Sequence, residues 1–362
     1  MARQPSRKVT KLRLPGLIDV HVHMREPGAT HKEDWESGTS AALAGGFTAV
    51  LAMPNTDPPV LDSTTLGSVL EIARSKARCD FAQFIGAGPE NAASAAGLAA
   101  KTAGLKMYLD LTFGDLRLDD MTLWEAHFLQ FPKAHPIVVH AEGRTLAAAI
   151  LFSHLHRRPV HIAHVSLREE ILLIRKAKGA GIPITCEVAP HHLFLTEDAA
   201  RGGAPAGVFD VRPALARQRD VDALWQNLDA IDCFATDHAP HTLAEKNGSQ
   251  PPPGFPGLET ALPLLLTAVR DGRLTLDDLV AKLYTRPREI FHLPEQRETW
   301  IEVDDASPYE VHASEQFTRC GWTPFEGWKV AGRVERVVLR GMEAYVDGKL
   351  RVQPGFGKHL RD

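Results

Sequence analysis

Short apolar runs alternate with stretches of helical periodicity through most of the chain. Eight of these runs have the length and composition of buried strands, and they lie at residues 17–23, 47–53, 80–86, 104–109, 136–141, 159–165, 182–188 and 231–237. Helical patterns fall between them at residues 34–45, 62–77, 119–131, 143–156, 167–179 and 219–228. Alternating strands and helices are typical of a parallel sheet built from βα units.

The number of strands favours a closed barrel over an open sheet. Eight βα units within roughly 250 residues are typical of a (β/α)8 barrel. A doubly wound open sheet is the alternative, but no Gly-x-Gly-x-x-Gly motif follows any of the strands. We therefore predict an α/β fold, a (β/α)8 TIM barrel over residues 14–290. Two further helical patterns, at 258–271 and 275–284, follow the eighth strand.

The pattern changes after Arg286-Pro287. Residues 298–303, 328–340 and 343–352 have the pattern of strands, with a turn at Asp347-Gly348, and residues 8–14 could add another strand. A segment of about 60 residues holds little core of its own. We therefore predict a small β-rich appendage, made of residues 1–13 and 291–362, that packs on the barrel.

Composition narrows the possible partners. The 41 lysines and arginines against 45 acids give a net charge of −4, which offers no reason to expect nucleic acid or an anionic membrane. No apolar run approaches the roughly 20 residues of a membrane span, and the first eight residues lack the apolar core of a signal peptide. The four cysteines are far apart and form no Cys-x-x-Cys pair. We expect a cytoplasmic protein that acts on a small molecule.

Histidine and aspartate collect where the predicted strands end. His21 and His23 close the first strand, and residues two apart on a strand share a face. His140 ends the fifth strand, His164 the sixth and Asp237 the eighth. Active sites of such barrels lie at these strand ends. Burial of an unpaired polar group there costs kilocalories per mole of folding free energy. The five residues therefore predict a metal site, with zinc the usual ion.

The number of donors favours two metal ions. Five donors exceed what one tetrahedral zinc with an open position needs, whereas two metals about 3.5–4 Å apart would use them all. Such a pair needs an anionic bridge, and Lys106 at the fourth strand end has no lone pair as an ammonium. Glu187 could bind a metal or position a histidine. We interpret His161 as structural, and His191 and His192 as supporting residues.

Several motifs resemble one known family, the dihydroorotases of the amidohydrolase superfamily. Residues 15–28 (PGLIDVHVHMREPG) and 235–241 (ATDHAPH) resemble its two signatures, and residues 52–56 and 186–192 fit as well. The segments PPPGFPGLET and WTPFEG are most similar to dihydroorotase domains of the animal multifunctional proteins that also carry carbamoyl-phosphate synthetase and aspartate transcarbamoylase. The resemblance implies a homodimer and fusion to those two domains.

The resemblance also implies the missing bridge. In the family, the lysine that matches Lys106 is carbamylated by CO2, which makes it a carboxylate-like anion. One zinc would then be held by His21, His23, Lys106 and Asp237, and the other by Lys106, His140 and His164. A third zinc in the animal domains uses the equivalent of Glu187 and a cysteine where this chain has Ala163. We therefore predict two zinc ions.

The implied reaction is the reversible cyclisation of N-carbamoyl-L-aspartate to L-dihydroorotate, a step of de novo pyrimidine biosynthesis, with Asp237 as the catalytic proton carrier. The family's substrate contacts fall on Arg25, Asn55, Arg212, His241 and Pro253. A flexible loop that covers the substrate falls on Thr112 and Phe113. The planar fork of arginine suits a carboxylate because it can donate two parallel hydrogen bonds.

Two alternatives remain open at this point. Another cyclic-amide hydrolase (a dihydropyrimidinase, hydantoinase or allantoinase) would use the same two-zinc barrel, but it has no need of the carboxylate contacts Arg25, Asn55 and His241. A non-catalytic amidohydrolase-like scaffold would typically have lost metal ligands, and this chain has all of them.

Overall fold

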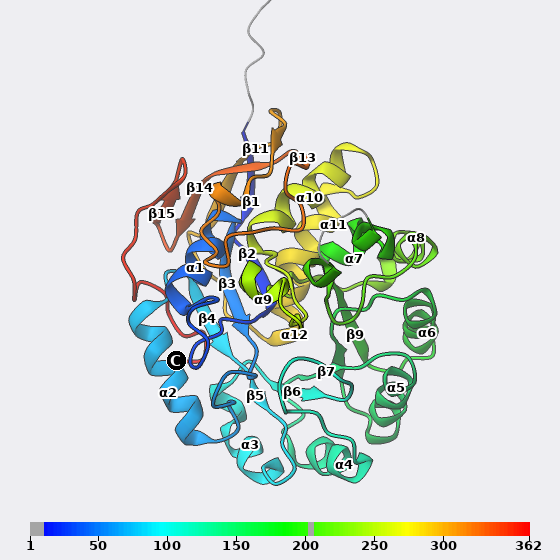
Figure 1. Ribbon diagram of the computed structural model, residues 1–362. Coiled ribbons are helices and arrows are strands. Elements are labelled where there is room, and N and C mark those ends of the chain that lie inside the picture. Colours follow the sequence, from blue (N-terminus) through cyan, green and yellow to red (C-terminus); the bar gives the residue numbers. More distant parts are fainter. Residues whose placement is uncertain (1–10, 202–205) are drawn as a thin grey trace, which may run out of the picture.

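The computed structural model describes residues 11–201 and 206–362. It confirms the predicted (β/α)8 barrel: parallel strands form a ring, and helices lie around its outside (Figure 1). The barrel strands are β2 (Leu17–Val22), β3 (Phe47–Ala52), β4 (Asp80–Gln83), β5 (Ile85–Gly86), β6 (Leu105–Tyr108), β7 (Ile137–His140), β8 (Val160–Ile162), β9 (Ile184–Val188) and β10 (Cys233–Phe234). Each predicted barrel strand is found at or within a few residues of its expected place.

The third predicted strand differs from the expectation because it is split at Phe84. Its first part, β4, pairs with β3, and its second part, β5, pairs with β6. The buried Phe84 still donates its N–H to Ala52 O at 2.9 Å. The strand thus passes from one sheet to the next, and it joins the β2-β3-β4 sheet to the β5-to-β10 sheet.

The ring closes between its first and last strands. Val22 bridges His238 in parallel, and His23 N donates to His238 O at 2.7 Å. Asp19 crosses the same seam, because its carboxylate accepts hydrogen bonds from Thr236 N and, at 2.5 Å, from Thr236 Oγ1. Closure leaves the barrel without an exposed strand edge.

Every helix that the apolar periodicity predicted is found in the structure. Further helices occur in segments that lack this periodicity. Those that were expected are α1 (Trp35–Ala44), α2 (Ser63–Lys76), α4 (Met121–Gln130), α5 (Arg144–His156), α6 (Arg168–Gly179), α8 (Gln218–Gln226), α10 (Leu258–Arg270) and α11 (Leu276–Val280). A π-helical turn at Ala281–Thr285 follows α11. The pattern did not predict α3 (Ala92–Leu98), α7 (Pro190–Phe194), α9 (Leu243–Lys246) and α12 (Arg286–Phe291). The α3 sequence, AASAAGL, has too few large apolar residues to show a face.

The predicted β-rich appendage is built from both chain ends. A five-stranded antiparallel sheet has the order β1 (Leu12–Pro15), β11 (Trp300–Asp304), β14 (Arg333–Leu339), β15 (Met342–Val346) and β16 (Lys349–Leu350). Two short strands, β12 (Tyr309–Glu310) and β13 (Lys329–Val330), pair beside it. The expected strand 328–340 is therefore two strands, and residues 8–10 of the expected strand 8–14 lie outside the described residues. The division at residues 14 and 290 stays a prediction.

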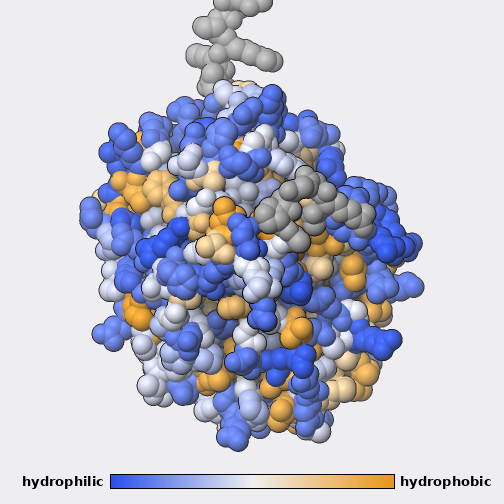
Figure 2. Space-filling model, viewed as in Figure 1, coloured by the Kyte–Doolittle hydropathy of each residue, from blue (hydrophilic) through white to orange (hydrophobic). Residues whose placement is uncertain are grey.

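Two apolar layers hold the barrel. Ile18, Val20 and Leu51 belong to a cluster inside the ring, whereas Leu17 and Val22 belong to the larger cluster between strands and helices. Both faces of the parallel strands are buried, as expected for strands covered by helices. On the visible face, hydrophobic side chains lie in small groups among hydrophilic ones (Figure 2).

Asp80 ties the barrel to the appendage. Its carboxylate, 4% exposed, accepts hydrogen bonds from Arg340 Nη1, from Lys358 N at 2.9 Å and from Gln296 Nε2 at 2.7 Å. Asp80→Ala should lower the free energy of unfolding by about 3 kcal/mol, because it leaves a partly buried guanidinium and a backbone N–H without their acceptor. Urea denaturation measures the change.

The control for Asp80 is Asp229→Ala. Asp229 Oδ2 lies 2.9 Å from Arg175 Nη2, but both side chains are more than half exposed. Loss of that pair should change the free energy of unfolding by less than about 1 kcal/mol. Equal stability of the two variants would contradict a structural role for Asp80.

Candidate metal centre and substrate pocket

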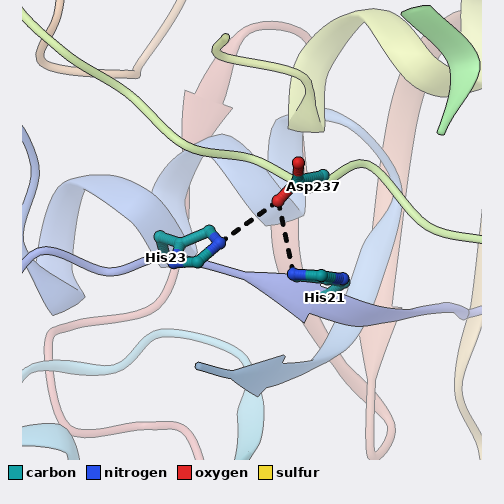
Figure 3. Close-up of side chains that lie close together, drawn as sticks. All are labelled: His21, His23 and Asp237. Atoms are coloured by element: carbon teal, nitrogen blue, oxygen red, sulfur yellow. Dashed lines mark hydrogen bonds and ion pairs between the residues drawn. The ribbon is translucent and has the colours of Figure 1, made fainter. Parts of the chain in front are cut away.

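Three side chains from the two strands at the barrel seam point toward one another (Figure 3). His21 Nε2 and His23 Nε2 lie 3.3 Å and 3.1 Å from Asp237 Oδ1. All three side chains are buried, and one potential ligand atom from each lies within 4.8 Å of the others. Two imidazoles and a carboxylate around one point are a donor set that suits zinc.

A local irregularity aims the two histidines. The pairing of β2 with β3 shifts register between Asp19 and Val22. Strict alternation from Ile18 and Val20, which face the barrel interior, would turn His21 outward. Such irregularities re-aim side chains next to active sites, and here the shift brings His21 inward.

A second group of donors lies at the ends of β7 and β8, which β9 separates from β10 in the sheet. His140 ends β7 and His164 follows β8, with His140 Nδ1 2.8 Å from His164 Nε2. The His164 ring centroid is 5.2 Å from that of His21, so the two groups adjoin. Lys106, on β6, is fully buried.

Unpartnered atoms in the second group suit a bound metal. Among the described residues, neither Lys106 Nζ nor His164 Nδ1 has a hydrogen-bond partner, although both atoms are buried. Leaving such groups unsatisfied costs about 1–3 kcal/mol each. Ligands that satisfy these groups would remove that cost, and the donors present therefore fit a metal pair.

Burial also sets the charge of the donors. It lowers the pKa of His23 to about 4 and the pKa of His164 well below its ordinary value, so both imidazoles are neutral near pH 7. Neutral imidazole is the form that binds metals. Burial lowers the pKa of Lys106 to about 8, against the opposing effect of the Glu187 and Asp237 charges.

The two carboxylates stay ionised. Burial alone would raise the pKa of Asp237, but the neighbouring His21 and the hydrogen bond with His23 outweigh it and hold the pKa well below its usual value. Burial likewise opposes ionisation of Glu187, and the neighbouring His21 and His161 lower its pKa. Both carboxylates therefore carry the negative charge that cations need.

Glu187 lies behind His21. Its Oε1 contacts His21 Nδ1, and its Oε2 lies 3.1 Å from His161 Nε2. The contact leaves His21 Nε2 free to face Asp237, an arrangement in which a carboxylate orients a metal-binding histidine. The predicted role of Glu187 as a metal ligand stays a prediction.

Arg25 and His241 form the polar wall next to these donors. Arg25 is buried directly after β2, where its Nε donates to Pro240 O at 3.1 Å and its Nη2 lies 2.9 Å from His241 Nε2. His241 Nε2 also lies 3.1 Å from Pro253 O. Burial lowers the pKa of Arg25 to about 10, which leaves the guanidinium charged at neutral pH.

Asn55 and Phe113 cover the pocket from the other side. Asn55 Oδ1 lies 2.7 Å from His23 Nδ1, and Asn55 Nδ2 donates to Phe113 O at 3.2 Å. The Phe113 ring packs edge-on against His241, with 5.0 Å between ring centroids, and Arg25 lies over its face. Phe113, from the predicted loop, therefore packs against the polar wall of the pocket.

One cavity collects most of the predicted residues. It is lined by His21, His23, Arg25, Asn55, Thr112, Phe113, His140, His164, Arg212, Asp237 and Pro253. Tyr108, Ala239 and Gly254 line it too and were not predicted. Among the predicted residues, Lys106, Glu187 and His241 are close by but do not line it.

Two buried lysines support this pocket and were missed by sequence reasoning. Lys246 Nζ donates to Asp210 O, Pro252 O and Gly254 O at 2.7, 3.0 and 3.2 Å, which fixes the loop that carries Pro253. Lys32 Nζ lies 3.1 Å from His241 Nδ1. Lysines in polar stretches ordinarily face solvent, so the sequence offered no signal for either.

Comparison with known proteins shows which family contains similar sequences. A family model described as dihydro-orotase-like matches residues 10–108. The dihydroorotase of Pyrococcus abyssi is 37% identical over 364 residues, which cover 95% of this chain and 86% of that protein. This chain belongs to the dihydroorotase family. The resemblance seen in the sequence motifs is confirmed.

Longer relatives contain this dihydroorotase sequence as one part. The multifunctional protein CAD of Squalus acanthias is 57% identical over 350 residues, which cover 97% of this chain but 16% of that protein. The chain likewise covers 16% of the length of the multifunctional protein pyr1-3 of Dictyostelium discoideum. In the part of the chain that the structure describes, no helix is long and apolar enough to cross a membrane.

Solved structures share the architecture of this chain. The inactive dihydroorotase-like domain of a Chaetomium thermophilum CAD-like protein superposes with a TM-score of 0.84 and 30% identity, covering 97% of this chain and 99% of that one. The L-hydantoinase of Arthrobacter aurescens gives a TM-score of 0.91 at 24% identity, covering 97% and 89%. The second likeness concerns the fold alone.

The unpartnered nitrogen of His164 leads to a test of metal binding. His164→Asn should lose bound zinc, by roughly one ion per chain, because it removes a donor of the second group. Elemental analysis of the purified protein measures the zinc content.

His161→Asn is the matched control for His164. His161 lies on β8, the strand that His164 follows, but its nitrogens already contact Thr185 Oγ1 at 2.9 Å and Glu187 Oε2 at 3.1 Å. This variant should keep its zinc. Equal zinc in both variants would show that His164 is not a ligand.

Proposed function

We propose that the chain catalyses the reversible cyclisation of N-carbamoyl-L-aspartate to L-dihydroorotate in pyrimidine biosynthesis. The observation that carries the proposal is one cavity that has two groups of buried metal donors on one side and the buried Arg25 on the other. A metal centre suits hydrolysis or formation of a cyclic amide, and a buried guanidinium suits a substrate carboxylate. Membership of the dihydroorotase family supports the same reaction.

Two zinc ions are part of the proposal. His21, His23 and Asp237 would hold one, His140 and His164 the other, and a carbamylated Lys106 would bridge them. When bound, zinc acts as a Lewis acid that makes water a nucleophile near neutral pH and polarises a carbonyl group. The buried and unpartnered Lys106 Nζ supports the bridge, because a carbamate would give it the oxygen donors that an ammonium lacks.

Asp237 moves the proton in the proposed mechanism. In the hydrolytic direction it accepts the proton of the attacking water and delivers it to the ring nitrogen that leaves. In the biosynthetic direction it removes a proton from the ureido nitrogen. Its buried, ionised carboxylate lies at the point where the first donor group meets the cavity, which is the geometry that a general base requires.

Arg25, His241 and Asn55 hold the α-carboxylate of the substrate. Arg25 is fixed by Pro240 O and His241, and Asn55 by His23 and Phe113, so these side chains are ordered before the substrate binds. Ordered groups place the reacting atoms without further loss of entropy. Arg212 and Pro253, which line the same cavity, complete the contacts.

The loop at Thr112 and Phe113 acts as a lid in this proposal. Phe113 packs on His241, and its ring faces the charged groups of Arg25 and Lys32. Lys32 Nζ lies 4.9 Å from the ring centroid. A closed loop excludes water from the charged groups beneath it, which strengthens their interactions with the substrate.

The proposed partners and cellular location of the chain rest on its resemblance to the same family. The identity with the Squalus acanthias protein supports fusion to further domains of pyrimidine synthesis. A homodimer and a cytoplasmic location complete the proposal. The four cysteines, all free and buried, fit a reducing compartment.

The alternative of a non-catalytic scaffold has one observation behind it, the related domain described as inactive. In the present chain both donor groups, the proton carrier and the carboxylate contacts meet at one cavity. A scaffold has no use for buried donors whose nitrogens lack partners, since they lower its stability.

A substrate panel tests the reaction. The purified chain loaded with zinc should interconvert N-carbamoyl-L-aspartate and L-dihydroorotate, with product measured by chromatography. Dihydrouracil, hydantoin and allantoin should react at least about 100-fold more slowly, because they leave Arg25 buried without a carboxylate. Faster hydrolysis of one of these three would favour the other cyclic-amide hydrolases, and no turnover of any substrate would favour a scaffold.

Asp237→Asn tests the proton role. The amide keeps the size of the side chain and one oxygen donor, so zinc and substrate should still bind, while kcat should fall by about 10²–10⁴. Elemental analysis, substrate binding and turnover are measured on the same preparation. Near-normal kcat would rule out Asp237 as the proton carrier.

A further inference from the structure

The hydroxyl group of Tyr108 is a buried polar group that the proposed mechanism does not use. Tyr108 lies on β6 two residues after Lys106, so both side chains point to the barrel interior. The residue is 2% exposed, and its Oη has no hydrogen-bond partner among the described residues. Buried tyrosine hydroxyls usually find a partner, and this one lines the cavity of the metal donors.

The surroundings of Tyr108 place it between the second donor group and the lid. Its ring centroid is 6.1 Å from that of His140, and Lys106 Nζ lies 5.2 Å from the ring. Thr112 and Phe113 follow it in the chain and line the same cavity. The tyrosine ring therefore lies beside the second donor group, in the same cavity as the lid residues.

The backbone holds Tyr108 in place. Residues of β6 pair with β7 on one side, and Leu109 N donates to His140 O at 2.9 Å. On the other side Tyr108 O accepts from Leu118 N at 2.9 Å, where the chain returns after the lid. Donors fixed in this way stabilise a developing charge without a cost of reorganisation.

The Tyr108 hydroxyl can act as a donor. A phenol has one O–H to donate, and its ordinary pKa of about 10 keeps it protonated at neutral pH.

We propose that Tyr108 is a further catalytic residue, whose Oη donates a hydrogen bond to the oxygen of the reacting carbonyl group. The inference rests on the proposed function, because it needs an oxygen that gains negative charge when the ring opens or closes. No covalent bond to Tyr108 forms and its proton is not transferred. The hydrogen bond is stronger to the tetrahedral transition state than to the planar substrate, so it raises kcat.

Tyr108→Phe tests the inference because it removes only the oxygen atom. The ring and its packing remain, so zinc content and thermal stability should equal those of the wild type. Turnover of L-dihydroorotate should fall by about 10–100-fold in kcat with KM changed less than about threefold.

The control is Tyr284→Phe. Tyr284 Oη accepts a hydrogen bond from Arg288 Nη1 at 3.3 Å in the π-helical turn, outside the residues that line the cavity. This variant also loses one tyrosine hydroxyl group, but Tyr284 does not line the cavity in which the substrate would bind. Its kcat and KM should both match those of the wild type.

Three results for Tyr108→Phe would overturn the inference: a kcat within twofold of the wild type, a rise in KM alone, or a loss of zinc or stability that accounts for the lower rate. The activity of the wild-type protein shows whether the role of Tyr108 or the proposed function itself has been contradicted. An inactive wild type contradicts the reaction itself and the inference with it. An active wild type beside a fully active Tyr108→Phe contradicts only the role of the hydroxyl.

Discussion

The seam that closes the barrel is the constraint on which the site depends. It brings β2 next to β10, and the Asp19 carboxylate accepts from Thr236 N although the two residues are 217 positions apart. One residue beyond Thr236, the carboxylate of Asp237 meets His21 and His23. Because the seam is made of backbone and buried side-chain hydrogen bonds, it places the first donor group with little freedom. The second donor group is then positioned by the order of the strands around the ring.

Low dielectric surroundings give these donors their chemistry. Burial keeps His23 and His164 neutral, while the neighbouring His21 and the hydrogen bond with His23 hold the pKa of Asp237 well below its usual value. It also leaves Lys106 Nζ and His164 Nδ1 without partners among the described residues, a cost that the apolar layers on both sides of the strands offset. Buried polar groups without partners break the usual rules of burial. Such groups are expected at a functional centre when the rest of the core is well packed.

The substrate side of the site depends on segments outside the barrel strands. Trp322, which lies between β12 and β13 of the appendage, donates its Nε1–H to His241 O at 2.6 Å. Nearby, Thr318 Oγ1 donates to Glu33 Oε2 at 2.5 Å, which ties the same segment to the loop before α1. Lys246 holds the loop of Pro253 through three carbonyl groups. The appendage therefore contributes to the geometry around His241 as well as to stability.

The sequence by itself determined the barrel and most of the donors, because apolar alternation is local and strand ends share one face of a parallel barrel. His140, His164 and Asp237 could thus be assigned to one mouth without coordinates. Only the tertiary structure decided the split of the third strand at Phe84, the register shift that turns His21 inward, and the burial of Lys246 and Tyr108. These features depend on contacts between segments distant in sequence. A local pattern records the type of side chain at each position, but it does not record which buried polar atom finds a partner.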